Sequence, residues 1–164
     1  MEQEAFLIGF SQLSLVLTGF VSVFVAFFMG SEESTRPMIH HAASMLAGSL
    51  LSVITALSPI VLFHYGMKDE KLWYWSSVLG LAVGTVYFTY MLSLSIRLTR
   101  VEFKEAGLIH MLASYGLGFI AFGLLISNLI SGAGPGHYVL ASISMFMIAV
   151  IGFVTFSLQK VLKW

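Results

Sequence analysis

Charged residues are confined to short segments between long apolar stretches, and this pattern constrains the fold more than any other feature. All eight Asp and Glu residues and all eight Lys and Arg residues lie outside residues 5–31, 38–67, 72–96 and 106–159. Each window exceeds the roughly 20 apolar residues that a helix needs to cross a bilayer core. Since a charged side chain at the bilayer centre costs about 2.5 kcal/mol or more, the pattern predicts membrane-spanning helices.

The last window is too long to be a single span. As one helix, residues 106–159 would extend about 80 Å at roughly 1.5 Å per residue, which no bilayer can contain. The GAGPG segment at residues 132–136 provides the break, because glycine opens backbone angles closed to other residues and proline cannot continue a helical hydrogen bond. We therefore predict an all-α, polytopic membrane helix bundle with five transmembrane helices, at about residues 5–29, 38–65, 72–96, 106–131 and 137–159.

Composition restricts what else the chain contains. It is 58% hydrophobic and 10% charged, and no segment between spans exceeds about a dozen residues, so we expect residues 1–164 to form a single transmembrane domain. The formal net charge of zero provides no basic surface for nucleic acid. The absence of cysteine excludes disulfides, thiolate metal ligands and thiol catalysis. No cleavable signal is expected, since Glu2 and Glu4 stand where a basic segment would precede the apolar run.

Lys and Arg are distributed unevenly between the two predicted sides of the membrane. The N-terminus and the two loops on its side hold only Lys68 and Lys71. The other side holds Arg36, Arg97, Arg100, Lys104, Lys160 and Lys163. By the positive-inside rule, this distribution predicts an N-terminus outside and a C-terminus in the cytoplasm. The aromatic residues expected to anchor span ends at the two interfaces are Trp73, Tyr74, Trp75, Tyr138 and Trp164.

An internal similarity relates two pairs of spans. Residues 39–48 and 109–118 share the pattern I-H-x-x-A-S-x-x-x-G, and both copies begin a span on the predicted cytoplasmic side. A parallel repeat, with spans two and three related to spans four and five by an axis along the membrane normal, would produce this pattern. Chance would also produce it, because Ile, Ala, Ser and Gly are common in membrane helices.

Small residues mark the faces along which we expect the spans to pack. Inside a bilayer no hydrophobic effect draws helices together, so small side chains that allow close backbone approach stabilise helix pairs. Asn128 in span four should point at another helix, because an amide is costly in lipid, and Pro59 predicts a kink in span two. The expected helix-packing residues are Ser44 and Gly48 in span two, Ser77, Gly80 and Gly84 in span three, and Ser114 and Gly118 in span four.

Span one carries polar side chains at helical spacing. Ser11, Ser14, Thr18 and Ser22 follow one another at steps of three or four residues, and Gln12 is adjacent. One interpretation is that the hydroxyls bond to carbonyls of their own helix or to a neighbouring helix, as is common in membrane proteins. The other is a water-filled path, within one bundle or around an oligomer axis, lined by Gln12, Ser14, Thr18 and Ser22.

Five histidines are the groups near the span ends that titrate close to neutral pH. His40, His41 and His110 fall near the predicted cytoplasmic boundary, and His64 and His137 near the outer one. There we expect solvated imidazoles with a pH-sensing role. Haem ligation is a distant alternative, because bis-histidine haem needs ligands on facing helices inside the protein. We expect no metal ion and no cofactor, since no carboxylate or thiolate lies within the spans.

Patterns typical of catalysis are missing from the sequence. No carboxylate at membrane depth is available for a Ser-His-Asp arrangement, and the glycine-rich turn at residues 132–136 lacks the Lys and Ser/Thr of a nucleotide-binding loop. The spans contain no Asp, Glu, Lys or Arg that could drive an ion-coupled carrier. We therefore expect no enzyme, no catalytic residue and no active transporter.

Several short motifs follow the order of the spans: Thr18-Gly19-Phe20, Leu57-Ser58-Pro59, Trp75-Ser76 and Gly136-His137-Tyr138. In these motifs the chain resembles a group of small, uncharacterised five-span proteins of the bacterial inner membrane, although Ser76 replaces the arginine expected after the tryptophan. The resemblance implies a five-span fold and a bacterial inner-membrane location. It implies no activity and no site.

Two function classes are compatible with these features. The first is a small homo-oligomeric pore or channel-like protein, in which span one or the small-residue faces meet around an axis and histidines near the mouths tune gating. The alternative is a non-conducting structural or accessory subunit that packs against another membrane protein. A histidine-ligated haem protein is more distant. The expected partners are the lipid bilayer and either further copies of the chain or another membrane subunit.

Overall fold

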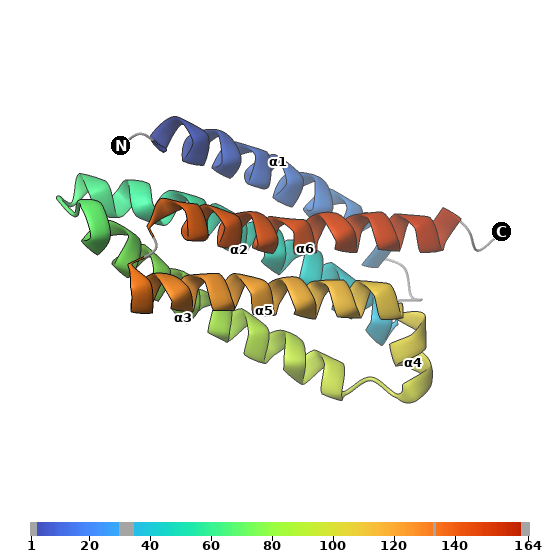
Figure 1. Cartoon of the computed structure of the whole chain (residues 1–164). Helices are drawn as coiled ribbons and strands as arrows, with labels where there is room; N and C mark the ends of the chain where they lie inside the picture. The colour runs from blue at the N-terminus through green and yellow to red at the C-terminus, as the bar shows by residue number, and fades with distance from the viewer. Residues whose placement is uncertain (1–2, 30–34, 133, 162–164) are drawn as a thin grey trace.

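The computed structural model of the protein describes residues 3–29, 35–132 and 134–161, and within these ranges its regular structure is entirely helical. Six helices follow one another along the chain: α1 (Glu4–Met29), α2 (Arg36–His64), α3 (Asp69–Ile96), α4 (Arg100–Glu105), α5 (Leu108–Ser131) and α6 (Pro135–Val161). Figure 1 shows the five long helices side by side, with α1 beginning at one end of the bundle and α6 ending at the other.

Five of these helices, all except α4, are long and apolar enough to cross a membrane. The prediction of five spans is therefore confirmed, with boundaries within three residues of those expected. The predicted break also lies where it was expected, because α5 ends at Ser131, Gly132 adopts a left-handed conformation (φ 59°) and α6 begins at Pro135. The outside location of the N-terminus stays a prediction.

The short helix α4 was not predicted from the sequence. Its start is stabilised by a capping box, in which the Glu102 amide donates to the Thr99 hydroxyl and the Thr99 amide donates to the Glu102 carboxylate. These bonds from Thr99 hold the pKa of the Glu102 carboxyl below its usual range. After α4 the chain turns at Gly107, whose φ of 83° favours glycine. This turn explains why α5 begins at Leu108 rather than two residues earlier.

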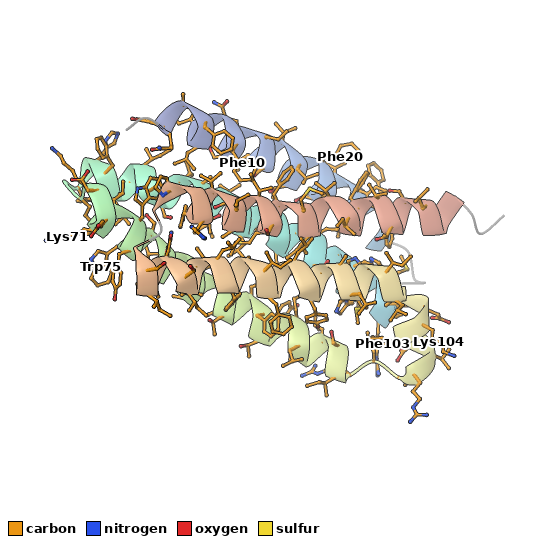
Figure 2. All side chains as sticks on the ribbon, viewed as in Figure 1. Phe10, Phe20, Lys71, Trp75, Phe103 and Lys104 are labelled. Atoms are coloured by element: carbon orange, nitrogen blue, oxygen red, sulfur yellow. The ribbon has the colours of Figure 1, made fainter. Side chains whose placement is uncertain are left out.

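Helices α2, α3, α5 and α6 form a closed ring, in which each helix packs against the next and α6 returns to α2. Helix α1 lies outside this ring against α2, as Figure 1 shows. Its phenylalanines reach α6, with ring centroids 5.4 Å apart for Phe10 and Phe146 and 5.3 Å apart for Phe20 and Phe153; Figure 2 labels Phe10 and Phe20. The interior of the protein is therefore a four-helix ring with one attached helix.

The order of the ring is compatible with the predicted repeat of α2 and α3 in α5 and α6. The matched glycines also have matched surroundings, because Gly48 of α2 lies against α6 and Gly118 of α5 lies near Phe88 of α3. A ring of four consecutive spans would have the same order without a duplication, so the repeat stays a prediction.

Pro59 lies inside α2 without ending it, and its consequence is a bond between helices. A proline has no amide hydrogen, so the carbonyl of Thr55, four residues earlier, loses its helical donor. The Tyr138 hydroxyl of α6 donates to that carbonyl at 2.7 Å, and the Ser58 hydroxyl lies 2.7 Å from the same tyrosine oxygen. We call Thr55, Ser58, Pro59 and Tyr138 the proline lock. It replaces the missing bond with a contact across the bundle.

The expectation that Tyr138 and Trp73 anchor span ends at the interface is wrong. Both side chains are buried, and their ring centroids lie 5.7 Å apart in the core. Tyr74 and Trp75 are about half-exposed, as an interfacial position requires; Trp75 is labelled in Figure 2. The sequence does not distinguish the two pairs because each lies at a helix start. Trp164 lies outside the described residues, as does Lys163.

Candidate functional site

The structure does not bring the proposed path-lining residues of span one together. Ser14 is fully buried on the side of α1 that faces the bundle, and its hydroxyl donates to the Phe10 carbonyl at 2.9 Å. Thr18 and Ser22 donate in the same way to the carbonyls four residues before them, each at 2.7 Å. The hydroxyls therefore make the intrahelical bonds of the first interpretation.

Gln12 lies on the opposite side of α1 from Ser14. At 100° per residue, two positions along a helix correspond to a rotation of about 200°. The Gln12 side chain is exposed, and so are Gly9 and Gly19 on the same outward side, where an added Cβ would meet nothing within 4 Å. The outward side of α1 therefore combines an amide with two positions that allow close backbone approach.

The expected packing residues lie at contacts between the ring helices. An added Cβ on Gly48 would lie 3.2 Å from the Ala149 nitrogen of α6, and one on Gly80 would lie 3.2 Å from Leu125 of α5. Gly84 faces Phe122 at the same distance. The expectation that Asn128 points at another helix is confirmed, because its amide donates to the Ser77 hydroxyl of α3 at 3.2 Å.

The closest approach at a glycine occurs at one that the sequence analysis did not select. A Cβ on Gly152 of α6 would lie 2.8 Å from Met45, 3.3 Å from the Cε1 atom of His110 and 3.4 Å from the Ser44 hydroxyl. Gly152 is not paired with a second small residue at a four-residue step, which is the signal that identified the others. It allows α6 to pack closely against His110 of α5 and against Ser44 and Met45 of α2.

His40, His41 and His110 form a buried cluster at the end of the bundle that carries α4. Each is about 99% buried, so the expectation of solvated imidazoles is wrong for these three. The rings of His41 and His110 stack with centroids 4.0 Å apart, and the ring of His40 lies 6.0 Å from that of His110. The sequence placed these residues near span ends, but it could not show that Ala106 at the end of α4 bonds to His41 or that Gly152 packs against His110.

Each imidazole of the cluster bonds to a neighbour through its Nε2 atom. His41 donates to the Ala106 carbonyl at the end of α4 (2.6 Å). His40 lies 2.8 Å from the Ser95 hydroxyl of α3, which also bonds to Tyr115, and His110 lies 3.2 Å from the Ser44 hydroxyl. The cluster thus connects α2, α3, α4 and α5.

The Nδ1 atoms of all three histidines are buried without a hydrogen-bond partner. Because a carbonyl can only accept, His41 carries its hydrogen on Nε2 when neutral, which leaves Nδ1 as a bare acceptor. Buried polar atoms without partners are rare in folded proteins and mark places where a proton, a water or a ligand is expected. Here three such atoms lie in one cluster.

A small cavity adjoins the cluster inside the ring. His40, Tyr87, Ser114 and Tyr115 are the polar residues of its lining, and the other lining residues are apolar. The space open to the centre of a water molecule is about 20 Å³, enough for one water. The Ser114 hydroxyl is also buried without a partner, so a water here would have two polar atoms to bind.

The geometry does not fit the distant haem alternative. Bis-histidine ligation requires two imidazole nitrogens that face each other across an iron. His41 and His110 are stacked in contact, and their Nε2 atoms already face Ala106 and Ser44. In the described part of the chain, no three His, Asp or Glu side chains are arranged to hold a metal ion.

The other two histidines lie apart from this cluster. His64 at the end of α2 is exposed, and His137 near the start of α6 is half-buried. Both are at the end of the bundle opposite α4. For these two residues the expected solvated position agrees with the structure.

Comparisons with known protein families, curated proteins and solved structures find no match to this chain. The resemblance to small five-span bacterial membrane proteins gains no support from them. What the fold defines is the broad class: five helices suited to crossing a membrane indicate an integral membrane protein.

Proposed function

We propose that the protein works as a homo-oligomeric, channel-like membrane protein whose copies meet along α1, in the bacterial inner membrane, without enzymatic activity. The observation that carries this proposal is the exposed Gln12 amide within α1, a helix long and apolar enough to cross a membrane. An amide facing lipid is costly, whereas the same amide can bond to a neighbouring helix. The open positions Gly9 and Gly19 on the same side would let a second α1 approach closely.

In this proposal the conducting path lies between copies rather than through one ring. The ring interior is filled by buried side chains that include Leu125, Tyr138 and Met145, and the cavity beside His40 has room for about one water. A path around an α1 axis would pass Gln12 and the exposed Ser22 rather than Ser14.

The histidine cluster is proposed to tune this assembly in response to pH. A proton added to one Nδ1 atom creates a donor that no acceptor faces, next to two other imidazoles. Such a charge in a dry site favours rearrangement that admits water. Because the cluster connects four helices, protonation would loosen the end of the bundle that carries α4.

The second candidate is a non-conducting accessory subunit, and the same side of α1 favours it. Gln12 would then bond to another membrane protein instead of a second copy. The two candidates differ in what the purified chain does alone, since only the first predicts a stable oligomer and conduction without a further protein.

The test is the oligomeric state in lipid nanodiscs together with ion flux in proteoliposomes. We expect an oligomer that Gln12→Leu weakens about threefold to thirtyfold in association constant, the range for one interhelical amide bond. Thr85→Val, an exposed hydroxyl on α3, is the matched control and should leave association unchanged. A monomer without flux at any pH between about 5 and 8 would overturn the channel proposal.

A further inference from the structure

A second pocket lies on the outside of the bundle at the α4 end, between the start of α2 and the end of α3. It has a volume of about 430 Å³ and is lined by Arg36, Ile39, Leu94, Arg97 and Leu98. Two of these side chains are cationic, three are apolar and none is acidic. The pocket is separate from the histidine cavity and from the outward side of α1.

The arginines retain most of their hydrogen-bonding capacity. One guanidinium nitrogen of Arg36 donates to the Arg97 carbonyl at 3.1 Å, which joins the two helix ends. A guanidinium has five N–H donors, so Arg36 keeps several for an anion. Within the described ranges, Glu102 is an acid that interacts with Arg36, and its carboxylate already accepts from the Thr99 amide.

The start of α2 adds to the positive potential of the pocket. The N-cap residue Thr35 makes no side-chain cap bond, and the first turn contains no acidic residue. Amide groups of the first turn are therefore left without a capping side chain, and the helix dipole favours an anion there. The pocket therefore has two sources of positive potential, the arginines and the helix start.

The apolar residues distinguish the kind of anion. Ile39, Leu94 and Leu98 lie at the ends of helices suited to crossing a membrane, where acyl chains meet headgroups. A free phosphate has no apolar part that could contact these three side chains. A zwitterionic headgroup would bring an ammonium group, and the lining offers it no carboxylate. We propose that this pocket binds an anionic phospholipid, with the phosphate on the arginines and an acyl chain along the three apolar side chains.

A lipid in this pocket would act on the histidine cluster through the backbone. Ile39 and Leu94 line the pocket, while the residues that follow them, His40 and Ser95, are bonded to each other at 2.8 Å on the inner side. A bound lipid would hold α2 and α3 together at this point. The inference does not depend on the proposed oligomer, since all five lining residues come from one chain.

Native mass spectrometry of the full chain, released from bilayers with equal phosphatidylglycerol and phosphatidylcholine, tests the proposal. We expect phosphatidylglycerol to be retained, and Arg36→Gln or Arg97→Gln to lower its retention roughly fivefold each. Lys68→Gln and Lys71→Gln remove the same charge at the opposite end, where Figure 2 labels Lys71, and should leave retention unchanged. Arg97→Gln keeps the backbone carbonyl at position 97, which accepts from the Arg36 guanidinium. A loss of lipid in this variant is therefore not explained by separation of the ends of α2 and α3.

Three results would overturn the proposal. Equal retention of both lipids by the unmodified protein would show that the pocket does not select an anionic headgroup. Equal losses in the arginine and lysine variants would assign the effect to overall charge. Release of phosphatidylglycerol by millimolar inorganic phosphate, without competition from added phosphatidylcholine, would show that the pocket binds phosphate alone.

Discussion

The two ends of α2 carry polar networks of opposite character. Near its C-terminal end, the proline lock pairs each of its polar groups: the Thr55 carbonyl accepts from Tyr138, and Tyr138 bonds to Ser58. Near its N-terminal end, the histidine cluster leaves three buried nitrogens without partners. A fully paired network adds stability and a unique arrangement, whereas an unpaired one costs stability. From this comparison we propose a structural role for the lock and a functional role for the cluster.

The largest effect is expected where both networks depend on the same helix contact. Gly48→Leu places a side chain against the backbone of α6, whose nearest atoms would lie 3.2 and 3.3 Å from an added Cβ. Because a backbone cannot move aside without separating α2 from α6, we expect a loss of about 3 kcal/mol or more. Unfolding in detergent would measure it. Gly123→Leu, which meets open space on α5, is the control, and equal losses in the two variants would contradict the packing described.

Tyr138→Phe tests the proline lock alone. The variant keeps the buried ring and removes the hydroxyl, so the Thr55 carbonyl loses its strongest donor. The Ser58 hydroxyl can still donate to that carbonyl at 3.3 Å, so we expect a loss of about 1–1.5 kcal/mol, the upper part of the range for one intramolecular hydrogen bond. Tyr74→Phe removes an exposed hydroxyl and should change stability by less than about 0.5 kcal/mol. An unfolding free energy unaffected by Tyr138→Phe would show that the lock contributes nothing.

His110→Leu tests the histidine cluster near the N-terminal end of α2. It removes one 3.2 Å bond to Ser44 but also removes a buried nitrogen without a partner, and these effects oppose each other. We expect stability at neutral pH to change by less than about 1 kcal/mol, less than for Tyr138→Phe. The exposed His64→Leu is the control. A larger loss from His110→Leu than from Tyr138→Phe would reverse the roles assigned to the two ends.

The smallest effect is expected at α4, whose C-cap residue Ala106 lies beside the histidine cluster. Thr99→Ala removes one half of the capping box, and amide hydrogen exchange within α4 should become faster while the five long helices are unaffected. The contribution of Glu102 should follow its lowered pKa: it is present above the unfolded-state pKa and is lost as the pH falls through the folded-state value. Exchange in α4 that is insensitive to both changes would contradict the capping role.

The sequence predicts the spans well because the long apolar windows are bounded by charge and the longest window is divided by the GAGPG segment at residues 132–136. It predicts the cluster poorly. Nothing in residues 97–107 indicates that the Ala106 carbonyl at the end of α4 accepts from His41. Gly152 of α6 meets both His110 of α5 and, more than a hundred positions earlier, Ser44 and Met45 of α2. Burial of the three imidazoles follows from these tertiary contacts, and they have no periodic signal in the sequence.

The proline lock was predictable only in part. Pro59 inside a span requires a new donor for the Thr55 carbonyl, but the sequence does not say that this donor is Tyr138, about eighty residues later. The separation of Gln12 from Ser14 was available earlier, since residues two positions apart in a helix face opposite sides. Helix geometry alone therefore separates Gln12 from Ser14, without any tertiary contact.

The most direct test of the account is the pH dependence of ion flux in proteoliposomes, compared between the unmodified protein, His110→Leu and Tyr138→Phe. The account predicts flux that changes as the pH is lowered below about 6 in the unmodified protein and in Tyr138→Phe, because burial disfavours the charged imidazole, and flux without this pH dependence in His110→Leu. An unchanged pH dependence in His110→Leu, or no flux from any of the three proteins, would contradict it.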